Sequence, residues 1–210
     1  MNNPTKTKKQ YVIESLAIVS VFVFFWLADI LTKLLIEKNF DQGLIREGVI
    51  IDIFLTFNKG MAFGILLPPW LLMTISLLMS IGIVVFYVKT YRKSNIIVKI
   101  LTMLILAGAF GNLVDRFFFV LGVPPYDRGV IHFIEPAFVD FAIFNLADSY
   151  LVVGLITIVI YFLVFEAIQA KTKNKKQIDD SLDQTNKLLT KEEIEKLNND
   201  SLNIKDDSKK

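Results

Sequence analysis

Residues 144–165 read FNLADSYLVVGLITIVIYFLVF, an apolar run that opens with the polar side chains of Asn145 and Asp148. A second acid, Asp140, stands eight residues before Asp148 in the block FVDF. An ionisable side chain is costly to hold in a membrane, and where one occurs it usually has a function. The stretch therefore predicts a membrane span with functional acids at its entrance.

The chain has further apolar runs of similar length. Crossing a bilayer as a helix takes about 20 apolar residues, and segments near this length occur at residues 15–36, 65–88, 100–120 and 149–165. The 210-residue chain is 53% hydrophobic with a mean hydropathy of +0.51, more apolar than an ordinary soluble domain. We predict an all-α membrane protein with four transmembrane helices and a small extracytoplasmic region of loops and β-structure.

Lysine and arginine residues cluster in three flanking segments, at residues 6–9, 89–99 and 171–176. The other two connections are poorer in these residues and contain several acids. Because basic flanks remain on the cytoplasmic side, we expect both termini to be cytoplasmic and both longer loops to face outward. The first apolar run is longer than the core of a signal peptide and lacks a small-residue cleavage site, so we expect it to be retained.

The composition changes after residue 170 to Lys, Asn, Asp and Glu with few aromatic residues. Such a segment cannot bury enough apolar surface to fold by itself. We therefore predict a membrane domain at residues 1–170 and a polar cytoplasmic tail at residues 171–210, mostly disordered. Within the tail, Thr190 and Glu193 match a capping box, which predicts a short helix.

The residue inventory excludes several kinds of chemistry. The absence of cysteine excludes a disulfide, a cysteine nucleophile and a thiolate metal site, and a single histidine, His132, excludes a multi-histidine metal site. The motifs HExxH, GxSxG and GxGD are absent. The net charge of +2 gives no reason to expect nucleic-acid binding. We expect no metal and no other cofactor.

Acids on three predicted spans fall at similar depths. At about 1.5 Å per helical residue, Asp29 lies about 21 Å, Asp115 about 24 Å and Asp148 about 27 Å from the inner end of its span. The hydrocarbon core is about 30 Å thick, so the three acids should meet just below the outer surface. Lys33 follows Asp29 by four residues on the same helical face, where a local ion pair is an equally simple explanation.

Small and polar residues accompany the acid on the third span. Gly108, Asn112 and Asp115 share one helical stripe in AGAFGNLVDR, where small residues allow close helix packing and polar residues bond across it. Arg116 should either pair with an acid or extend to the headgroups. The block FNKGMAFG, residues 57–64, has the glycines and the amide of a turn that carries a side chain into a site, although an interfacial loop explains it equally well.

Neighbouring carboxylates in a site of low polarity cannot both ionise easily, so their proton affinities separate. One can then take a proton from water while the other protonates the substrate, which is aspartyl hydrolysis. The alternative from another class is a small proton-coupled transporter or channel subunit, because membrane acids also mark ion pathways. Transporter sites usually lie near the bilayer midplane on broken helices, whereas these acids are expected near one surface.

Four blocks, DILTK, FNKGMAFG, GNLVDR and FNLADS, occur in this order relative to the four spans. Through them the chain, from residue 12 to about residue 166, resembles bacterial lipoprotein signal peptidase, the signal peptidase II family. A single block is weak evidence, but four in order are specific. The residues that carry the resemblance are Asp29, Lys33, Asn58, Gly60, Asn112, Asp115, Arg116, Asn145 and Asp148.

The resemblance implies an aspartyl endopeptidase of the bacterial cytoplasmic membrane. Such an enzyme removes the signal peptide of diacylglyceryl-modified prolipoproteins by cutting just before the lipidated cysteine. The expected partners are these substrates and membrane lipids, and sensitivity to a globomycin-type inhibitor is implied as well. Asp148 is implied as a catalytic acid, and the other residues of the four blocks just named as substrate-binding or supporting residues.

The second catalytic acid departs from the family pattern. The resemblance implies an upstream Asp in a VDF block, which here is Asp140, only eight residues before Asp148. Relatives have a longer interval with a short β-hairpin, and at that distance this chain has His132 in GVIHFI. Eight extended residues span more than roughly 20 Å, so the chain must fold back for the two acids to meet. We predict the pair Asp148 and Asp140, with Asp115 and His132 as the alternatives to Asp140.

Overall fold

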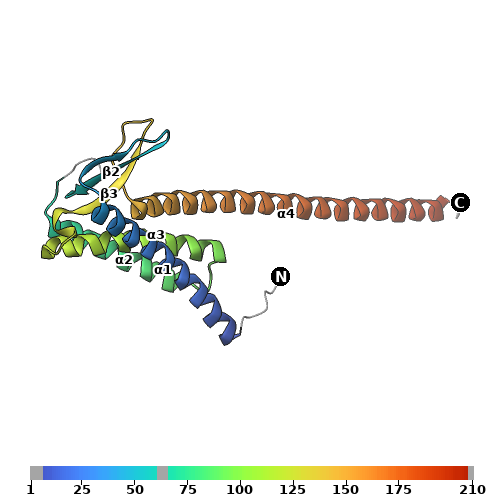
Figure 1. The fold of residues 1–210 in the computed structure, drawn as a ribbon. Helices are drawn as coiled ribbons and strands as arrows, with labels where there is room; N and C mark the ends of the chain where they lie inside the picture. The colour runs from blue at the N-terminus through green and yellow to red at the C-terminus, as the bar shows by residue number, and fades with distance from the viewer. Residues whose placement is uncertain (1–6, 61–65, 208–210) are drawn as a thin grey trace. The chain divides into compact units, whose positions relative to one another are not determined.

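The computed structural model describes residues 7–60 and 66–207 (Figure 1). In chain order its elements are α1 (Lys8–Asn39), β1 (Gly43–Arg46), β2 (Ile51–Asn58), α2 (Pro69–Thr90), α3 (Ile96–Leu121), the 3-10 turn η2 (Tyr126–Arg128), β3 (Val130–Pro136) and α4 (Leu146–Asp207). Within these residues, four helices are long and apolar enough to cross a membrane. The predicted spans and the small β-region between them are confirmed.

Local sequence signals set several helix ends. Thr7 Oγ1 accepts from Gln10 N–H at 3.3 Å while Gln10 Oε1 accepts from Thr7 N–H at 2.8 Å, a capping box that begins α1. Asn95 Oδ1 accepts from Val98 N–H at 3.0 Å and begins α3. Gly122 ends α3 with a φ of 66°, a left-handed conformation that glycine adopts without steric cost.

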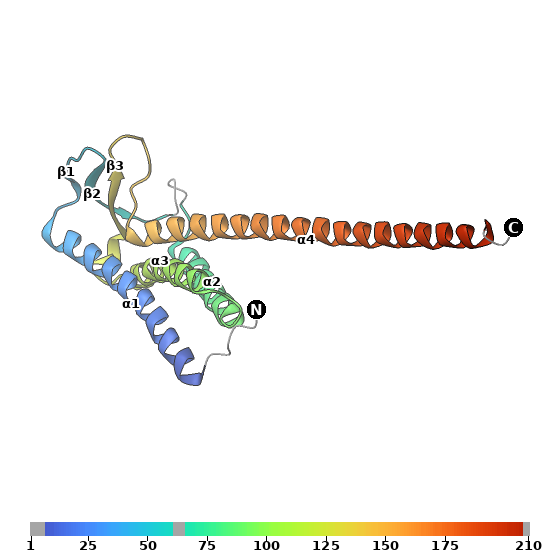
Figure 2. The same ribbon diagram turned by 90° about the vertical axis from the view of Figure 1, so that its right-hand side faces the viewer.

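Helix α3 is the buried helix of the group. In its most apolar window 72% of the residues are buried, against 11% in α1 and 11% in α2. Figures 1 and 2 show α1, α2 and α3 side by side. The outward faces of α1 and α2 carry large apolar side chains, as expected of helices that contact lipid. The polar residues of α3 therefore face other helices and can form a site.

Strands β1, β2 and β3 form an antiparallel sheet in that order. Its buried core includes Leu55, Ile131 and Phe133. After β3 the chain leaves the sheet and returns, because Ile134 pairs with Phe144 in an isolated bridge. This bridge brings β3 and the start of α4 next to each other, although about ten residues separate them along the chain.

The chain divides into two compact units, Met1–Val159 and Ile160–Lys210. In the second unit α4 continues to Asp207, so the structure has a helix where the sequence predicts a mostly disordered tail. All side chains between residues 171 and 185 are exposed there. The side chain of Thr190, part of the predicted capping box, lies outside the described residues. The domain division at residue 170 stays a prediction.

Candidate active site

Asp148 lies in the first turn of α4 and takes part in the cap of that helix. Its backbone N–H donates to Asn145 Oδ1 at 3.0 Å, and its Oδ2 accepts from Asn145 N–H at 3.2 Å. This reciprocal pair has the geometry of a capping box. The helix N-terminus also carries partial positive charge, which favours a carboxylate at this position. The contacts that begin α4 therefore also hold Asp148.

Asn112 of α3 joins this cap to a second helix. Its Nδ2 donates to Asp148 Oδ1 at 2.7 Å, and its Oδ1 accepts from Asn145 Nδ2 at 3.1 Å. Asn145 Nδ2 also donates to the Ile131 carbonyl of β3 at 3.1 Å. Both oxygens of Asp148 thus accept a hydrogen bond, an arrangement suited to a carboxylate. Elements α3, α4 and β3 converge on this one side chain.

A fully buried ion cluster lies against the same network. Lys33 Nζ is 2.6 Å from Asp29 Oδ2 and 2.7 Å from Asp115 Oδ2, and all three side chains are 0% exposed. Lys33 Nζ also donates to Asn112 Oδ1 at 3.4 Å. The second oxygen of Asp29 accepts from Ala147 N–H at 2.9 Å and so satisfies another free donor at the start of α4. The three acids converge as their predicted depths require.

Two glycines of α3 allow this close approach. A Cβ at Gly111 would lie 2.5 Å from Asp29 Oδ2 and 3.3 Å from Ala147 Cβ, both shorter than ordinary contact at 3.4 Å. A Cβ at Gly108 would collide with the Ala147 carbonyl oxygen and lie 2.9 Å from Leu151 Cγ. The small residues of the AGAFG stripe therefore let the first turn of α4 pack directly on the backbone of α3.

A cavity of about 870 Å³ opens beside Asp148, large enough for a segment of substrate. Its polar lining includes Asn58, Gly60, Arg116 and His132, and the rest of its wall is mostly aliphatic and aromatic. The Asp148 side chain is 30% exposed, so it is accessible from this cavity. Among the described residues, no three acidic or histidine side chains are grouped so as to hold a metal ion.

Two predicted site residues in the cavity wall, Asn58 and Arg116, are held by hydrogen bonds. Asn58 Oδ1 accepts from Gly60 N–H at 2.8 Å, which fixes a turn at the end of β2. Arg116 Nη1 donates to Ser76 Oγ at 3.0 Å, and its buried Nε has no hydrogen-bond partner within the described part of the chain. The sequence predicted an acid or a headgroup as the partner of Arg116, and the structure places Asp148 and Asp115 close enough to interact with it electrostatically. No sequence pattern singled out Ser76. Residues 61–64, the rest of the FNKGMAFG block, lie outside the described residues.

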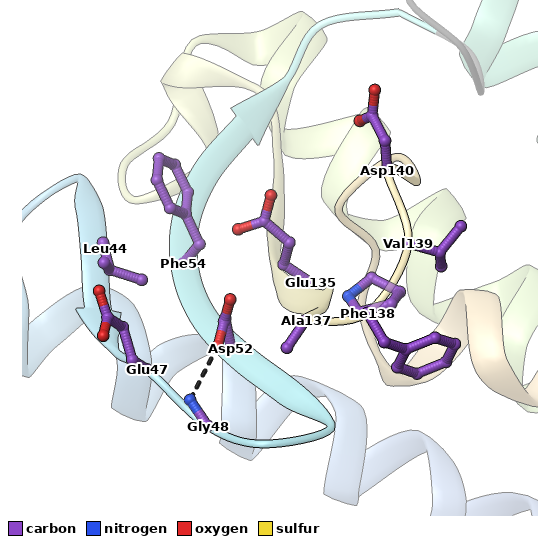
Figure 3. A pocket seen from close by; sticks show the side chains of 11 residues that line it. Leu44, Glu47, Gly48, Asp52, Phe54, Glu135, Ala137, Phe138, Val139 and Asp140 are labelled. Atoms are coloured by element: carbon purple, nitrogen blue, oxygen red, sulfur yellow. Dashed lines mark hydrogen bonds between the residues drawn. The ribbon is translucent and has the colours of Figure 1, made fainter.

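Asp140 lies in the loop after β3 and does not meet Asp148. It lines a different cavity, of about 620 Å³, together with Glu135 and Phe54 (Figure 3). The chain does fold back between the two acids through the bridge of Ile134 and Phe144, but Asp140 is not among the residues that line the cavity beside Asp148. The structure therefore does not bring the predicted acid pair together.

His132 of β3 is the side chain that faces Asp148. Its Nε2 lies 3.5 Å from Asp148 Oδ2, and its Nδ1 donates to the Ile143 carbonyl at 2.8 Å. Burial lowers the pKa of His132, and the neighbouring carboxylate opposes this change. Asp115, the other alternative, is fully buried against Lys33 and does not line the cavity. The spacing of His132 in GVIHFI is the sequence signal that marks this position.

Comparison with known proteins places the matched region over this site. Residues 21–164 match the family model described as Signal peptidase (SPase) II. Proteins named lipoprotein signal peptidase from Streptococcus pyogenes serotype M5 (strain Manfredo) and serotype M18 (strain MGAS8232) are each 37% identical over 135 residues, 63% of this chain and 83% of theirs.

Solved structures agree with this match. One described as a bacterial membrane enzyme at 2.3 Å resolution has a TM-score of 0.58 and 30% identity, and covers 70% of this chain and 87% of its own. Another at 1.9 Å resolution has a TM-score of 0.57 and 32% identity, and covers 70% of this chain and 92% of its own. The similarity therefore extends to both sequence and fold.

Proposed function

This chain belongs to the signal peptidase II family of aspartic peptidases and removes signal peptides from prolipoproteins, and we propose that Asp148 is its catalytic carboxylate. One observation carries this assignment. Among the described residues that line the cavity of about 870 Å³, Asp148 is the only acid. Its side chain is 30% exposed, whereas Asp29 and Asp115 are at 0%. A carboxylate that contacts the attacking water and the substrate must be reachable from the cavity.

The other polar residues of the cavity are proposed to bind the substrate. Arg116 lines the cavity, and its guanidinium is proposed to donate to the carbonyl oxygen on which negative charge develops during attack. Asn58 and Gly60 form a turn at the end of β2, and both line the cavity. They are proposed to bind the peptide backbone of the substrate.

The buried residues are proposed to support the site without touching substrate. Asp29 holds the start of α4 through Ala147 N–H, and Lys33 with Asp115 balances its charge. The amides of Asn112 and Asn145 aim the Asp148 carboxylate, as described above. Residues on rigid helices position a reacting group more precisely than residues on loops.

The cavity rim supports a lipid-modified substrate. Leu66, Phe141 and Val152 line the cavity and are 78%, 48% and 55% exposed. A rim of this kind is apolar toward the surface that faces lipid, so the acyl chains of a diacylglyceryl-modified cysteine can stay in the bilayer while the preceding peptide bond reaches Asp148. We propose cleavage just before that cysteine, and inhibition by a globomycin-type compound that occupies the same cavity.

The proposed setting is the bacterial cytoplasmic membrane, with both termini in the cytoplasm. The basic segments at residues 89–99 and 171–176 support this orientation, because such flanks remain on the inner side. The three-stranded sheet and Asp148 would then lie on the outer side, where a lipid-anchored precursor arrives. The matches to peptidases give no support to the alternative of a proton-coupled transporter.

The test is cleavage of a purified diacylglyceryl-modified prolipoprotein by the full-length protein in detergent or lipid. Asp148→Asn should reduce kcat by at least about 10²-fold, the lower end for loss of a group that stabilises charge in the transition state. Asp41→Asn, at an exposed acid outside the cavity, is the matched control and should cleave normally. Full activity of a folded Asp148→Asn variant would refute the assignment.

A further inference from the structure

The Asp148 carboxylate has one titratable neighbour in contact with it among the described residues. His132 Nε2 lies 3.5 Å from Asp148 Oδ2, and both side chains line the cavity proposed for substrate. A water molecule in the cavity can contact both groups at this separation. The predicted partner, Asp140, lines another cavity, so an acid pair is not assembled at this site.

The orientation of the imidazole is set by its other nitrogen. Ile143 offers a carbonyl oxygen, which can only accept, so Nδ1 must carry the proton in their 2.8 Å hydrogen bond. In neutral His132 the lone pair therefore lies on Nε2, the atom that faces Asp148. Because the His132 side chain is only 9% exposed and is held between β3 and the chain leading into α4, it has little freedom to turn away.

We propose that His132 is the second catalytic residue of this enzyme, the acid–base partner of Asp148 in the position where an aspartic peptidase would have another carboxylate. This inference rests on the proposed function of Asp148. Both oxygens of Asp148 accept hydrogen bonds from amides, which suits a carboxylate that stabilises an imidazolium beside it.

The chemistry balances with these two groups and one water. The water oxygen forms a bond to the scissile carbonyl carbon, the carbonyl π electrons move to oxygen, and one water proton passes to His132 Nε2. When the carbon–nitrogen bond breaks, its electron pair stays on nitrogen and the proton on Nε2 passes to that nitrogen, so His132 returns to its neutral form. Asp148 accepts a hydrogen bond from the water throughout and remains a carboxylate.

The surrounding charges are consistent with a neutral His132 as the base. Burial is the largest influence and lowers its pKa, Asp148 and the hydrogen bond to the Ile143 carbonyl oppose this, and Lys33 and Arg116 add to the lowering. Lys59 also lines the cavity. Cleavage by the wild type should therefore decline on acidification only below about pH 6.5, the value of an unperturbed imidazole.

The experiment compares cleavage of a diacylglyceryl-modified prolipoprotein by four variants of the full-length protein over a range of pH. His132→Gln should lose at least about 10²-fold in kcat. Asp140→Asn tests the alternative partner and should cleave like the wild type. Glu135→Gln, which removes another ionisable group from β3 outside this cavity, is the matched control. His132→Asp should recover part of the lost activity with a changed pH profile, because a carboxyl group can again exchange the proton.

The outcomes separate the two proposals. An inactive wild type would count against the proposed function itself. An active wild type together with an equally active His132→Gln, or with an inactive but folded Asp140→Asn, would overturn only the role of His132. If His132→Gln does not fold, by its melting temperature, His132→Asp decides. If the cleavage rate of His132→Asp declines on acidification over the same pH range as that of the wild type, residue 132 does not carry the proton.

Discussion

Replacing Gly111 by alanine should disable the active site through one methyl group. The added Cβ would lie 2.5 Å from Asp29 Oδ2, and the carboxylate must retreat by about 0.9 Å to reach ordinary contact at 3.4 Å. It has no free direction, because Oδ2 is 2.6 Å from Lys33 Nζ and Oδ1 accepts from Ala147 N–H at 2.9 Å. The retreat therefore either separates the buried ion pair or displaces the first turn of α4.

The expected size of the effect follows from what is attached to that turn. Asp148 directly follows Ala147, and a displacement of about 1 Å at a reacting group can lower a rate about 10²-fold. We expect Gly111→Ala to lower kcat/KM for prolipoprotein cleavage by a similar factor, and to lower stability by about 1–3 kcal/mol through overpacking. Gly82→Ala on α2 is the matched control, since a Cβ there meets nothing within 4 Å.

A double-mutant cycle tests whether the effect of Gly111→Ala arises from its contact with Asp29. In an Asp29→Ala background the oxygen that meets the new methyl group is gone, so adding Gly111→Ala should cost much less than it does in the wild type. Equal losses from Gly111→Ala in both backgrounds would refute the reasoning. Wild-type kcat/KM in the single Gly111→Ala variant would refute it more directly.

Three further perturbations test other parts of the network. Asp29→Ala leaves a buried lysine short of a partner and should lower the free energy of unfolding by about 3–5 kcal/mol, whereas Glu37→Gln, which breaks an exposed ion pair, should lower it by about 0–1 kcal/mol. Asn112→Ala should lower kcat about 10- to 100-fold, the equivalent of about 1.5–3 kcal/mol for a hydrogen bond to a charged group, while Asn39→Ala should have no effect. Folding lowers the pKa of His132, so below about pH 6.5 the unfolded chain binds more protons than the folded chain. The free energy of unfolding should therefore decrease as the pH is lowered through this range, and it should decrease less steeply in His132→Gln.

Each of these has a measurement that can contradict it. Denaturant unfolding in detergent gives the free energy of unfolding of Asp29→Ala and Glu37→Gln. Equal decreases in the two variants would mean that burial of the Lys33 ion pair does not affect stability. Cleavage assays measure the amide variants, and an unchanged kcat in Asn112→Ala would remove that amide from the mechanism. Melting temperatures between pH 5 and pH 8 measure the histidine, a range chosen around its ordinary pKa of about 6.5. Identical pH slopes in wild type and His132→Gln would show that His132 does not titrate on unfolding.

The membrane spans and most of the site residues could be predicted from sequence because both depend on regular helices. Periodic rise fixes depth along a helix, so Asp29, Asp115 and Asp148 could be placed in one layer before any contact was known. The same regularity placed Gly108 and Asn112 on one face of α3. The structure adds what periodicity cannot supply, namely that Asp29 accepts from the start of another helix and that one lysine joins two acids.

The partner of Asp148 could not be predicted in the same way. FVDF is a local pattern, and proximity along the chain favours Asp140. Proximity in space is set by the pairing of Ile134 with Phe144, a contact between segments that no helical period relates. Residues 137–143 form the loop between these paired segments, and in it Asp140 lines the other cavity, while His132, on the strand itself, faces Asp148 at the start of α4. The FVDF motif led to the prediction of Asp140, whereas the pairing of β3 with Phe144 determines which side chain faces Asp148.

The way Asp148 is held explains how an acid can be kept among apolar helices. A carboxylate in apolar surroundings is unstable without partners, and here each partner also has a structural task. Asp148 completes the helix cap by accepting from the backbone N–H of Asn145. The buried side-chain amide of Asn112 donates to Asp148 and accepts from Asn145, so both of its polar atoms are paired. Removing the acid therefore leaves buried amides unpaired, so Asp148→Asn, which keeps an acceptor oxygen, should preserve the fold far better than Asp148→Ala. A difference in melting temperature between these two variants would separate the structural role of the side chain from its chemical one.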